Sequence, residues 1–397
     1  MNVPKLRFKE FTGEWEITCL KDVITRINRV SDDFAPSMMI TADSGFVLQS
    51  EKYSKDMTGE SLKKYITLFK GELAYNHGAS KLRPYGSTFV LNEERAKVPF
   101  VYHCFAINKG ITDFYGLYLN RWEFGKKLKP LISSSARLDG LLNISFESFT
   151  NIKVNTPNFT EQEKIADFLN LVGEKINIQK DIVASLEKQN KGLMQKIFSQ
   201  ELRFKDDNGK EFPAWEDKKL GEVAKIYDGT HQTPNYVDNG IKFVSVEDIR
   251  CLYDSNKFIT VEAFNSNFKV YPQKGDILMT RIGDIGTATL VNGDEPIAYY
   301  VSLALMKPFG ILGKFLLQYI KSNDFQHELW RRTLHIAFPK KINKNEIGEC
   351  LVMVPCKREQ EKIAELLSSY DDKIEVEKKS LEKWQQIKKG LLQQMFV

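Results

Sequence analysis

The spacing of apolar residues between positions 161 and 198 predicts one long amphipathic helix. Apolar side chains recur there at alternating steps of four and three residues, with polar residues between them. The pattern lasts about five heptads, which is typical of a coiled-coil seam. Gln179 and Asn190 interrupt it, as polar residues do where register is specified at some cost in stability. The predicted seam consists of Ile165, Leu169, Val172, Ile176, Val183, Leu186, Leu193 and Ile197.

The same pattern returns 198 positions later. Residues 161–198 and 359–396 align without a gap and share 15 identities in 38 positions, and both copies begin with EQEKIA. A proline stands four residues before each copy, at Pro157 and Pro355. The interruptions also match, because Glu377 and Lys388 take the places of Gln179 and Asn190. The second predicted seam consists of Ile363, Leu367, Tyr370, Ile374, Leu381, Trp384, Leu391 and Met395.

Each of these helices needs a partner. A helix of this length would extend about 57 Å, which exceeds the width of a domain of this size. The alternative, in which each helix packs only on its own domain, would therefore leave most of each seam exposed. The first helix delivers the chain to its second half, and the second helix begins where that half ends. We therefore predict antiparallel pairing, which brings the C-terminus beside the N-terminus, and a capping box of Thr160 and Glu163 at the first helix start.

A weaker repeat marks where the second half begins. LRFK occurs at residues 6–9 and 202–205, and tryptophan, leucine and valine follow each copy at similar spacing. The chain is therefore predicted to be a tandem duplication with pseudo-twofold symmetry. The predicted parts are one domain at 1–158, a long helix at 159–199, a second domain at 200–356 and a second long helix at 357–397.

The two domains mix short strand-like runs, helical stretches and polar turns, which is typical of an α+β fold. The predicted fold class is thus α+β, with two similar α/β domains separated by two long helices that form an antiparallel coiled coil. KGEL at 70–73 and KGDI at 274–277 each open a short apolar strand at corresponding places. Strands are predicted at 88–91, 98–107, 242–246, 276–279 and 298–306, and helices at 116–127 and 314–332.

Polar loops in both domains are candidate DNA-reading elements. The loops at 75–86 and 280–287 follow strands, and together they carry Asn, Arg, Lys, Ser and His side chains. Such side chains recognise base edges, because Arg or Lys pairs with guanine and Asn or Gln with adenine. An ordinary solvated turn is the alternative for each residue, and a solvated charged face is the alternative for the basic stretch at 331–344. The candidate DNA-binding residues are Asn76, His77, Ser80, Lys81, Arg83, Tyr85, Ser134, Arg137, Thr230, His231, Thr280, Arg281, Asp284, Thr287, Arg331, Arg332, His335, Lys340 and Lys341.

Composition places the chain among globular proteins of the cell interior. Of its 397 residues, 42% are hydrophobic and 27% are charged. No apolar run is long enough to span a membrane, and the first residues lack the apolar core of a signal peptide. The five cysteines form no CxxC pair, which predicts reduced thiols and argues against a metal or disulfide site. A cytoplasmic location is therefore expected.

Net charge favours a nucleic-acid contact that is local. The chain carries a net charge of +5, with 22 basic and 17 acidic residues in 1–158 but 20 and 21 in 199–356. A protein that held DNA alone through many phosphates would carry a stronger basic footprint. If this chain binds DNA, partners are expected to share the contact.

Catalytic motifs are absent from the sequence. It contains no GxxxxGK[ST] phosphate loop, no GxSxG, no HExxH and no GxGxxG. It also lacks the Asn-Pro-Pro-aromatic motif of adenine methyltransferases, and its five histidines suggest no triad. We therefore predict that this chain is not an enzyme and has neither catalytic residues nor a metal site.

The organisation of the whole chain resembles the specificity subunit of Type I restriction-modification enzymes. Two variable domains alternate with two similar helices, a proline precedes EQEKIA at each helix start, and KGDI opens a strand and turn in the variable region. The resemblance is strong in the helices and weak in the divergent centres. It implies that residues near 5–158 and 200–356 are target recognition domains, each reading one half of a bipartite asymmetric DNA site. The helices would set the spacer between the half-sites and dock two modification subunits.

The resemblance also implies partners and cofactors. The partners would be double-stranded DNA, two modification (methyltransferase) subunits and restriction/translocase subunits that act in host defence, with no membrane. S-adenosylmethionine, ATP and magnesium would belong to those subunits, and this chain would hold no cofactor. A coiled-coil scaffold without sequence-selective DNA binding is the alternative, whereas a stand-alone methyltransferase or nuclease would need motifs that the sequence lacks.

Overall fold

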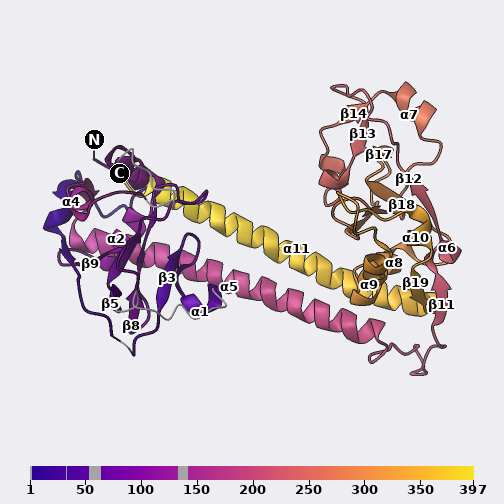
Figure 1. Cartoon of the computed structure of the whole chain (residues 1–397), viewed down its shortest axis with the longest axis horizontal. Helices are drawn as coiled ribbons and strands as arrows, with labels where there is room; N and C mark the ends of the chain where they lie inside the picture. Colours follow the sequence, from indigo (N-terminus) through magenta and orange to yellow (C-terminus); the bar gives the residue numbers. More distant parts are fainter. Residues whose placement is uncertain (1, 33, 53–63, 133–141) are drawn as a thin grey trace. The chain divides into compact units, whose positions relative to one another are not determined.

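The computed structural model describes residues 2–32, 34–52, 64–132 and 142–397. The chain forms two compact units, of which unit 1 comprises residues 1–180 and 380–397 and unit 2 comprises residues 181–379. Each unit contains one α+β domain and one half of each long helix (Figure 1). The long helices are α5 (Phe159–Phe198) and α11 (Lys357–Gln394).

Unit 1 is built on a four-stranded antiparallel sheet in the order β2-β9-β6-β7. Three antiparallel strand pairs, β1-β10, β3-β4 and β5-β8, complete its strands. The strands are β1 (Glu16–Cys19), β2 (Ile24–Arg26), β3 (Met38–Thr41), β4 (Gly45–Leu48), β5 (Ile66–Phe69), β6 (Leu73–Asn76), β7 (Ser87–Val90), β8 (Arg95–Val98), β9 (His103–Ile107) and β10 (Lys153–Thr156). The helices of its domain are α1 (Gln49–Lys52), α2 (Thr112–Leu119), α3 (Trp122–Leu128) and α4 (Phe146–Thr150).

Unit 2 repeats this frame with a different second sheet. Its four-stranded antiparallel sheet has the order β12-β18-β15-β16, and β11 pairs with β19. A three-stranded sheet, β14-β13-β17, contains the parallel pair β13-β17. The strands are β11 (Glu216–Lys219), β12 (Ala224–Asp228), β13 (Ile241–Val244), β14 (Phe258–Ile259), β15 (Ile277–Thr280), β16 (Ala288–Leu290), β17 (Ile297–Tyr299), β18 (Leu303–Pro308) and β19 (Leu351–Val354). The helices of its domain are α6 (Leu220–Val223), α7 (Val261–Asn267), α8 (Gly313–Ile320), α9 (Asn323–Arg332) and α10 (Lys344–Gly348).

Each domain core continues onto the long helices. In unit 1 the start of α5 and the end of α11 share a buried cluster with the sheet, and in unit 2 the end of α5 and the start of α11 do the same. The helices therefore run antiparallel within each unit. The sixteen predicted seam residues are buried or half-buried. The apolar seam residues at the helix ends belong to the buried clusters of the two domains, so the seam continues each domain core.

The chain termini meet in unit 1 as predicted, and Figure 1 shows N and C side by side. The backbone N–H of Leu6 donates to the carbonyl of Gln394 at 2.9 Å. In unit 2 the N–H of Leu202 donates to the carbonyl of Lys196 at the same distance. Lys196 and Gln394 are equivalent positions of the helical repeat, so the chain ends in unit 1 reproduce the covalent junction in unit 2.

EQEKIA attaches each long helix to its domain. In unit 1 the Arg7 guanidinium forms two 2.7 Å hydrogen bonds with the carboxylate of Glu161, which has no exposed side-chain surface. In unit 2 Arg203 contacts the equally buried Glu359 at 3.2 and 2.7 Å. Both arginines belong to the LRFK repeat and also donate to carbonyls of the loop that follows it. We call each of these ion pairs the clasp of its unit.

The glutamine of the same motif positions a helix of the domain. Gln162 donates to the carbonyl of Pro157 at 2.9 Å and accepts from the N–H of Ile111, the N-cap residue of α2, at 3.0 Å. Gln360 makes the equivalent bonds in unit 2, to Pro355 and to the N-cap residue of α8, both at 2.8 Å. The repeat is therefore retained where the helix and its domain share buried polar contacts.

Several predicted elements are divided in the structure. The helix predicted at 116–127 is instead α2 and α3, and the helix predicted at 314–332 is α8 and α9. Ser322 ends α8 because its extended backbone and its side chain cap the next helix, accepting from the N–H of Phe325 at 3.3 Å. The strand predicted at 298–306 turns between β17 and β18, which lie in different sheets. The strand predicted at 98–107 likewise covers the end of β8 and all of β9, with a turn between them.

The predicted capping box was wrong. Helix α5 begins at Phe159, so Thr160 lies inside it. The side chain of Asn158 accepts from the N–H of Glu161 at 2.9 Å and caps the helix instead. Asparagine is as effective an N-cap as serine or threonine.

Candidate nucleic-acid interface

The last residue of β6 and the loop between β6 and β7 carry six of the candidate residues in unit 1. Asn76 donates to the carbonyl of Ile40 at 3.0 Å and accepts from the N–H of Gly78 at 2.8 Å. Arg83 is half-buried and donates to the carbonyls of Ala42 and Asn120. These side chains hold the loop against neighbouring segments.

The remaining candidates of this loop differ in exposure. Ser80 and Lys81 are exposed at its tip, whereas Tyr85 is half-buried with its ring 5.4 Å from that of Trp122. Ser80 also closes the loop, because its hydroxyl accepts from the N–H of Arg83 at 3.0 Å. Among the residues that the structure describes, Lys81 has no ion-pair partner, so it is the cation of this loop that can reach a phosphate.

His77 lies directly after β6 and is only 8% exposed. Its Nδ1 lies 3.1 Å from the carbonyl of Leu142, and its ring centroid lies 4.1 Å from that of His103. Burial lowers the pKa of His77. Burial, followed by the nearby His77, lowers the pKa of His103 to about 4. Both imidazoles are therefore neutral near pH 7 and hold the segment before α4.

Arg281 occupies the equivalent position in unit 2, directly after β15, and is 6% exposed. Its guanidinium forms an ion pair with Asp228, and its Nε donates to the carbonyl of Ile342 at 3.1 Å. Its backbone carbonyl accepts from the N–H of Ile342 at 3.0 Å, as that of His77 accepts from Leu142. We call His77 and Arg281 the strand-end anchors, because each ties a central strand to the segment before a short helix.

Three candidate segments of unit 2 come together around Arg281. Its backbone N–H donates to Ser302, which lies beside the segment at 228–232 because Val301 donates to Thr230. The N–H of Gly283 donates to the carbonyl of Lys340 at 2.8 Å, so the loop at 280–287 lies against the basic stretch. The predicted DNA-reading segments of this unit thus form one continuous surface.

Within that surface the candidates divide into buried and exposed residues. Thr280 is fully buried and bonds within its own loop. Thr230, Thr287 and Arg332 are half-buried. The exposed candidates are His231, Asp284, Arg331, His335, Lys340 and Lys341.

The DNA contacts of these residues stay predictions. Ser134 and Arg137, the remaining two candidates, lie outside the described residues.

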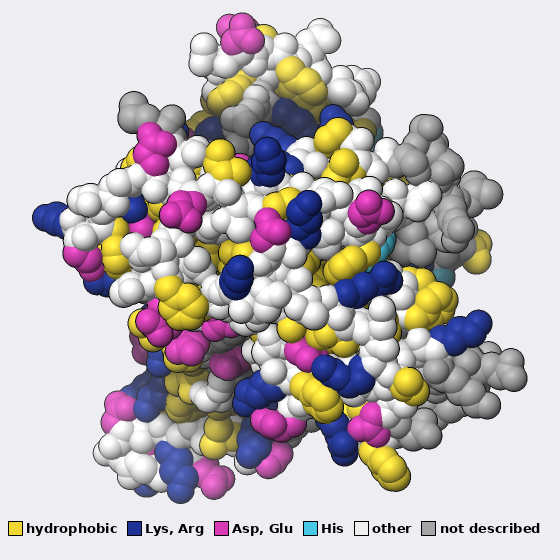
Figure 2. All heavy atoms as spheres, turned by 90° about the vertical axis from the view of Figure 1, so that its left-hand side faces the viewer, with side chains coloured by type: hydrophobic (Ala, Val, Ile, Leu, Met, Phe, Trp, Pro, Cys, Tyr) yellow, Lys and Arg dark blue, Asp and Glu magenta, His cyan; other side chains and the backbone are white. Residues whose placement is uncertain are grey.

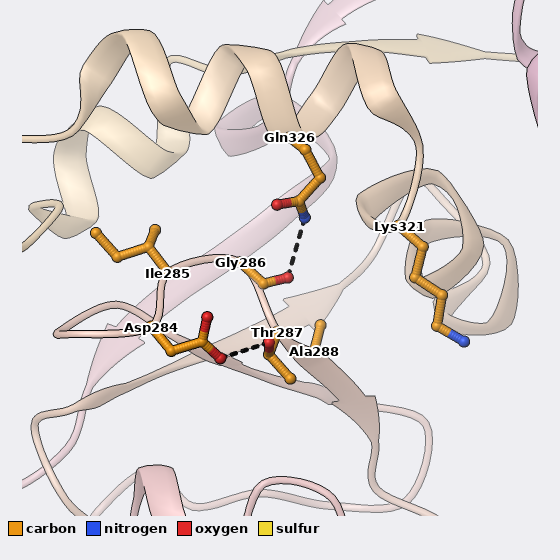
Figure 3. Close-up of a pocket in the computed structure, with 7 residues that line it drawn as sticks. All are labelled: Asp284, Ile285, Gly286, Thr287, Ala288, Lys321 and Gln326. Carbon is orange, nitrogen blue, oxygen red and sulfur yellow. Dashed lines mark hydrogen bonds between the residues drawn. The ribbon is translucent and has the colours of Figure 1, made fainter. Parts of the chain in front are cut away.

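A shallow pocket beside the 280–287 loop is lined by both polar and apolar side chains (Figure 3). Gln326 of α9 donates to the carbonyl of Gly286 at 3.0 Å, and the hydroxyl of Thr287 donates to Asp284 at 2.7 Å. Gly286 has φ +96°, and a Cβ there would lie 2.6 Å from Gln326. Gln326 of α9 therefore fixes one side of the loop (Figure 3).

Charge on the surface of unit 1 is mixed. Figure 2 shows Lys and Arg side chains interspersed with Asp and Glu over this face, with no single basic area. This distribution agrees with the modest net charge of the sequence. A DNA contact on this face would rest on a few cations.

The described ranges contain no group of three or more His, Cys, Asp or Glu side chains arranged to hold a metal ion. All five cysteines are free thiols, and burial raises the pKa of Cys104 and Cys350 to about 12. Among the helices in the described part of the chain, none combines the length and apolar character needed to cross a membrane.

Sequence reasoning missed the residues of the clasps and an apolar loop tip. Arg7 and Arg203 stand at the same place of the LRFK repeat, and this recurrence was the signal that could have identified them. Ile336 and Phe338 lie inside the basic stretch and are fully exposed. Their apolar character suggests burial, so only the structure reveals their position.

Comparisons with known proteins agree with this organisation. A family model described as the Type I restriction modification DNA specificity domain matches the chain twice, at residues 13–188 and 214–386. The Type I restriction enzyme MjaVIII specificity subunit of Methanocaldococcus jannaschii is 28% identical, over 72% of this chain and 69% of the relative. The putative Type I restriction enzyme MjaX specificity subunit of the same organism is 25% identical, over 98% of this chain and 95% of the relative.

Solved structures share the fold over the full length. The S subunit of a Type I restriction-modification system from M. genitalium superposes with a TM-score of 0.62 at 15% identity, covering 100% of this chain and 99% of that one. A chain from a study of Type I system assembly and conformational transition gives a TM-score of 0.53 at 14% identity, covering 96% and 97%. With two matched recognition domains on two paired helices, this chain belongs to the family of Type I restriction-modification specificity subunits.

Proposed function

We propose that this chain reads a bipartite, asymmetric DNA site, with each domain recognising one half. The observation that carries the proposal is that the two units share some parts of their structure and differ in others. The clasps and the four-stranded sheets are equivalent, whereas the remaining strands are arranged differently and the loops at 75–86 and 280–287 differ in sequence. Two different readers on one common frame are suited to two different half-sites, because base readout depends on the loop side chains.

In this proposal the long helices set the spacer and dock two modification subunits. Ile178 on α5 and Val376 on α11 occupy equivalent positions of the repeat, and each is more than half exposed. A matched pair of exposed aliphatic side chains supports two equivalent docking contacts for a pair of identical partners. Restriction/translocase subunits would join the complex through those partners.

The chemistry belongs to the partner subunits in this proposal. Modification subunits would bring S-adenosylmethionine and methylate adenine, and the translocase subunits would bring ATP and magnesium for cleavage. This chain, which binds double-stranded DNA, holds no cofactor and acts by placing those subunits at a chosen sequence.

The test is to reconstitute the chain with its modification subunits and map methylated adenines in random-sequence DNA. We expect methylation at two different half-sites separated by a spacer of fixed length and free sequence. The chain alone, free of other subunits, should transfer no methyl groups. Assembly without any sequence-selective DNA binding would contradict the proposal and favour a coiled-coil scaffold.

A further inference from the structure

The loop between α9 and α10 exposes two large apolar side chains. Ile336 is 99% exposed and Phe338 is 104% exposed, the highest values among large hydrophobic residues in the part of the chain that the structure describes. Leu334 and Trp330 beside them are also exposed. We call residues 334–341 the apolar tip.

The tip is held in place at both ends. The N–H of Leu334 donates to the carbonyl of Lys341 at 2.8 Å, and Lys341 also forms a β-bridge with Ile282. His335 lies against Trp330, with its Nε2 2.8 Å from that residue's carbonyl oxygen and their rings 4.9 Å apart. Two exposed apolar side chains therefore project from a fixed base that is shared with the 280–287 loop.

The surroundings of the tip are cationic. Residues 331–344 include five Lys and Arg and no Asp or Glu. Arg331 and Arg332 pair with Glu328, and Lys344 lies 3.9 Å from Asp228. Arg332 also pairs with Glu346. Lys340 and Lys341 are exposed and form no ion pair with any residue that the structure describes. The tip thus carries apolar side chains next to cations that remain available to an anionic partner.

This combination favours DNA over a protein partner. Protein interfaces are depleted in lysine, whose charge is strongly hydrated. Proteins that deform DNA combine basic residues on phosphates with Phe, Leu, Ile or Met side chains wedged between base steps. We propose that the apolar tip enters a groove of the bound DNA, with Ile336 and Phe338 against the bases and Lys340 and Lys341 on the adjacent phosphates.

The inference rests on the proposed function, since it requires unit 2 to bind DNA. It adds that apolar side chains of unit 2 contact the bases. The wedge widens the groove and partly unstacks one base step, so that the sequence preference at that step depends on its flexibility. Pyrimidine–purine steps unstack most easily and are therefore expected there.

The test uses the full chain reconstituted with its modification subunits. The double variant Ile336→Ala and Phe338→Ala should bind the mapped site roughly tenfold or more weakly, with an unchanged salt dependence. Lys340→Ala with Lys341→Ala should instead lower the slope of log affinity against log salt by about one per lysine. Phe309→Ala is the matched control, because Phe309 is also exposed and lies outside the tip.

A second measurement identifies the wedge itself. 2-Aminopurine placed at successive positions of the second half-site should brighten at one step with the parent chain and remain quenched with the double variant. If the double variant had the DNA affinity and the 2-aminopurine fluorescence of the parent chain, the wedge would be overturned. The proposed function would still stand, provided that the parent complex binds DNA with site selectivity. Loss of assembly with the modification subunits, at unchanged DNA affinity of the assembled complex, would assign the tip to a protein contact. A parent complex that binds DNA without selectivity would refute the proposed function itself.

Discussion

One layer of the paired helices is filled differently in the two units. In unit 2 the side chain of Asn190 donates to Asp371 at 3.1 Å, and Asp371 also accepts from Gln318 and Lys321. In unit 1 the equivalent positions hold Lys388 and Gly173. A Cβ on Gly173 would lie 2.8 Å from the Nζ of Lys388, so the glycine leaves room for the longer side chain.

The difference shows that each helix is matched to its partner layer by layer. A hydrogen-bonded pair in one unit is replaced in the other by a long side chain over a glycine. If α5 took the place of α11, Asn190 would face Gly173 and would lose the hydrogen bond that Asp371 accepts. This layer therefore favours pairing of the two different helices, as buried polar positions do in other coiled coils.

The clasps differ in a smaller way. In unit 2 the indole N–H of Trp215 donates to Glu359 at 3.0 Å and adds a second partner to that carboxylate, besides Arg203. In unit 1 the indole Nε1 of the equivalent Trp15 is buried and has no hydrogen-bond partner among the described residues. Glu161 therefore depends on Arg7 more than Glu359 depends on Arg203.

The largest expected effect follows from this dependence. Arg7→Ala leaves a buried carboxylate unpaired and should destabilise unit 1 by about 3–5 kcal/mol. Arg203→Ala should destabilise unit 2 by about 1 kcal/mol less, because the Trp215 hydrogen bond remains. Hydrogen exchange of β9 and β18 reports the two units separately, since a chain of two units has no single unfolding free energy.

Arg250→Ala is the matched control for both variants, because Arg250 is exposed and its loss should leave both strands unchanged. Equal losses in the two units would mean that the Trp215 bond does not contribute. A loss in unit 1 confined to the N-terminal residues would show that the clasp holds only the chain end.

The second prediction concerns a fragment of residues 1–200. Its exposed seam should pair with that of a second copy, antiparallel, with Asn190 of each copy facing Gly173 of the other. Gly173→Asp restores the acceptor that unit 2 provides, and it does so twice per dimer. At about 1 kcal/mol per restored hydrogen bond, the dimer should tighten roughly 30-fold, as sedimentation equilibrium would measure.

Gly173→Ala separates the hydrogen bond from the gain in helix propensity that any replacement of a helical glycine brings. It should tighten the dimer less than Gly173→Asp does. With modification subunits, the dimer should methylate an inverted repeat of the first half-site, because a twofold protein presents identical readers. A monomeric fragment in all three forms would show that the two helices are not interchangeable.

The helices could be predicted from sequence because their signal is local and long. Five heptads of periodicity and an ungapped repeat leave few alternatives for residues 161–198 and 359–396. The strand-end anchors could not be predicted, because their roles depend on contacts more than 60 residues away along the chain. His77 and Arg281 have the side chains of base readers, and only tertiary packing shows that both face inward.

The apolar tip was missed for the opposite reason. Ile336 and Phe338 are residues that usually lie inside a protein, so their types carry no sign of exposure. The break between α8 and α9 was hidden by an apolar pattern that continues across Ser322. Side-chain capping, which stops one helix and starts the next, outweighs that pattern there.

The anchors supply the third and smallest expected effect, a difference in pH response. The neutral His77–His103 pair in unit 1 has pKa values lowered by burial, to about 4 for His103. Histidine in an unfolded chain has a pKa of about 6.5. The unfolded state therefore binds more protons between these values, so stability is fully present above about pH 6.5 and is lost as the pH falls towards 4. Arg26 also lowers the pKa of His103 and adds to this loss.

In unit 2 the equivalent anchor is Arg281, which takes the place of the imidazole and is paired with Asp228. Lowering the pH from 7 to about 5.5, only partway through the window, should therefore reduce the exchange protection of β6 and β9, corrected for intrinsic rates, more than that of β15 and β18. His103→Gln should remove much of the difference, because glutamine can still donate to the carbonyl of Ile144, which lies 2.9 Å from Nε2, and does not titrate. Equal responses in the two units, or a response that persists with glutamine at position 103, would assign the pH sensitivity to carboxylates elsewhere.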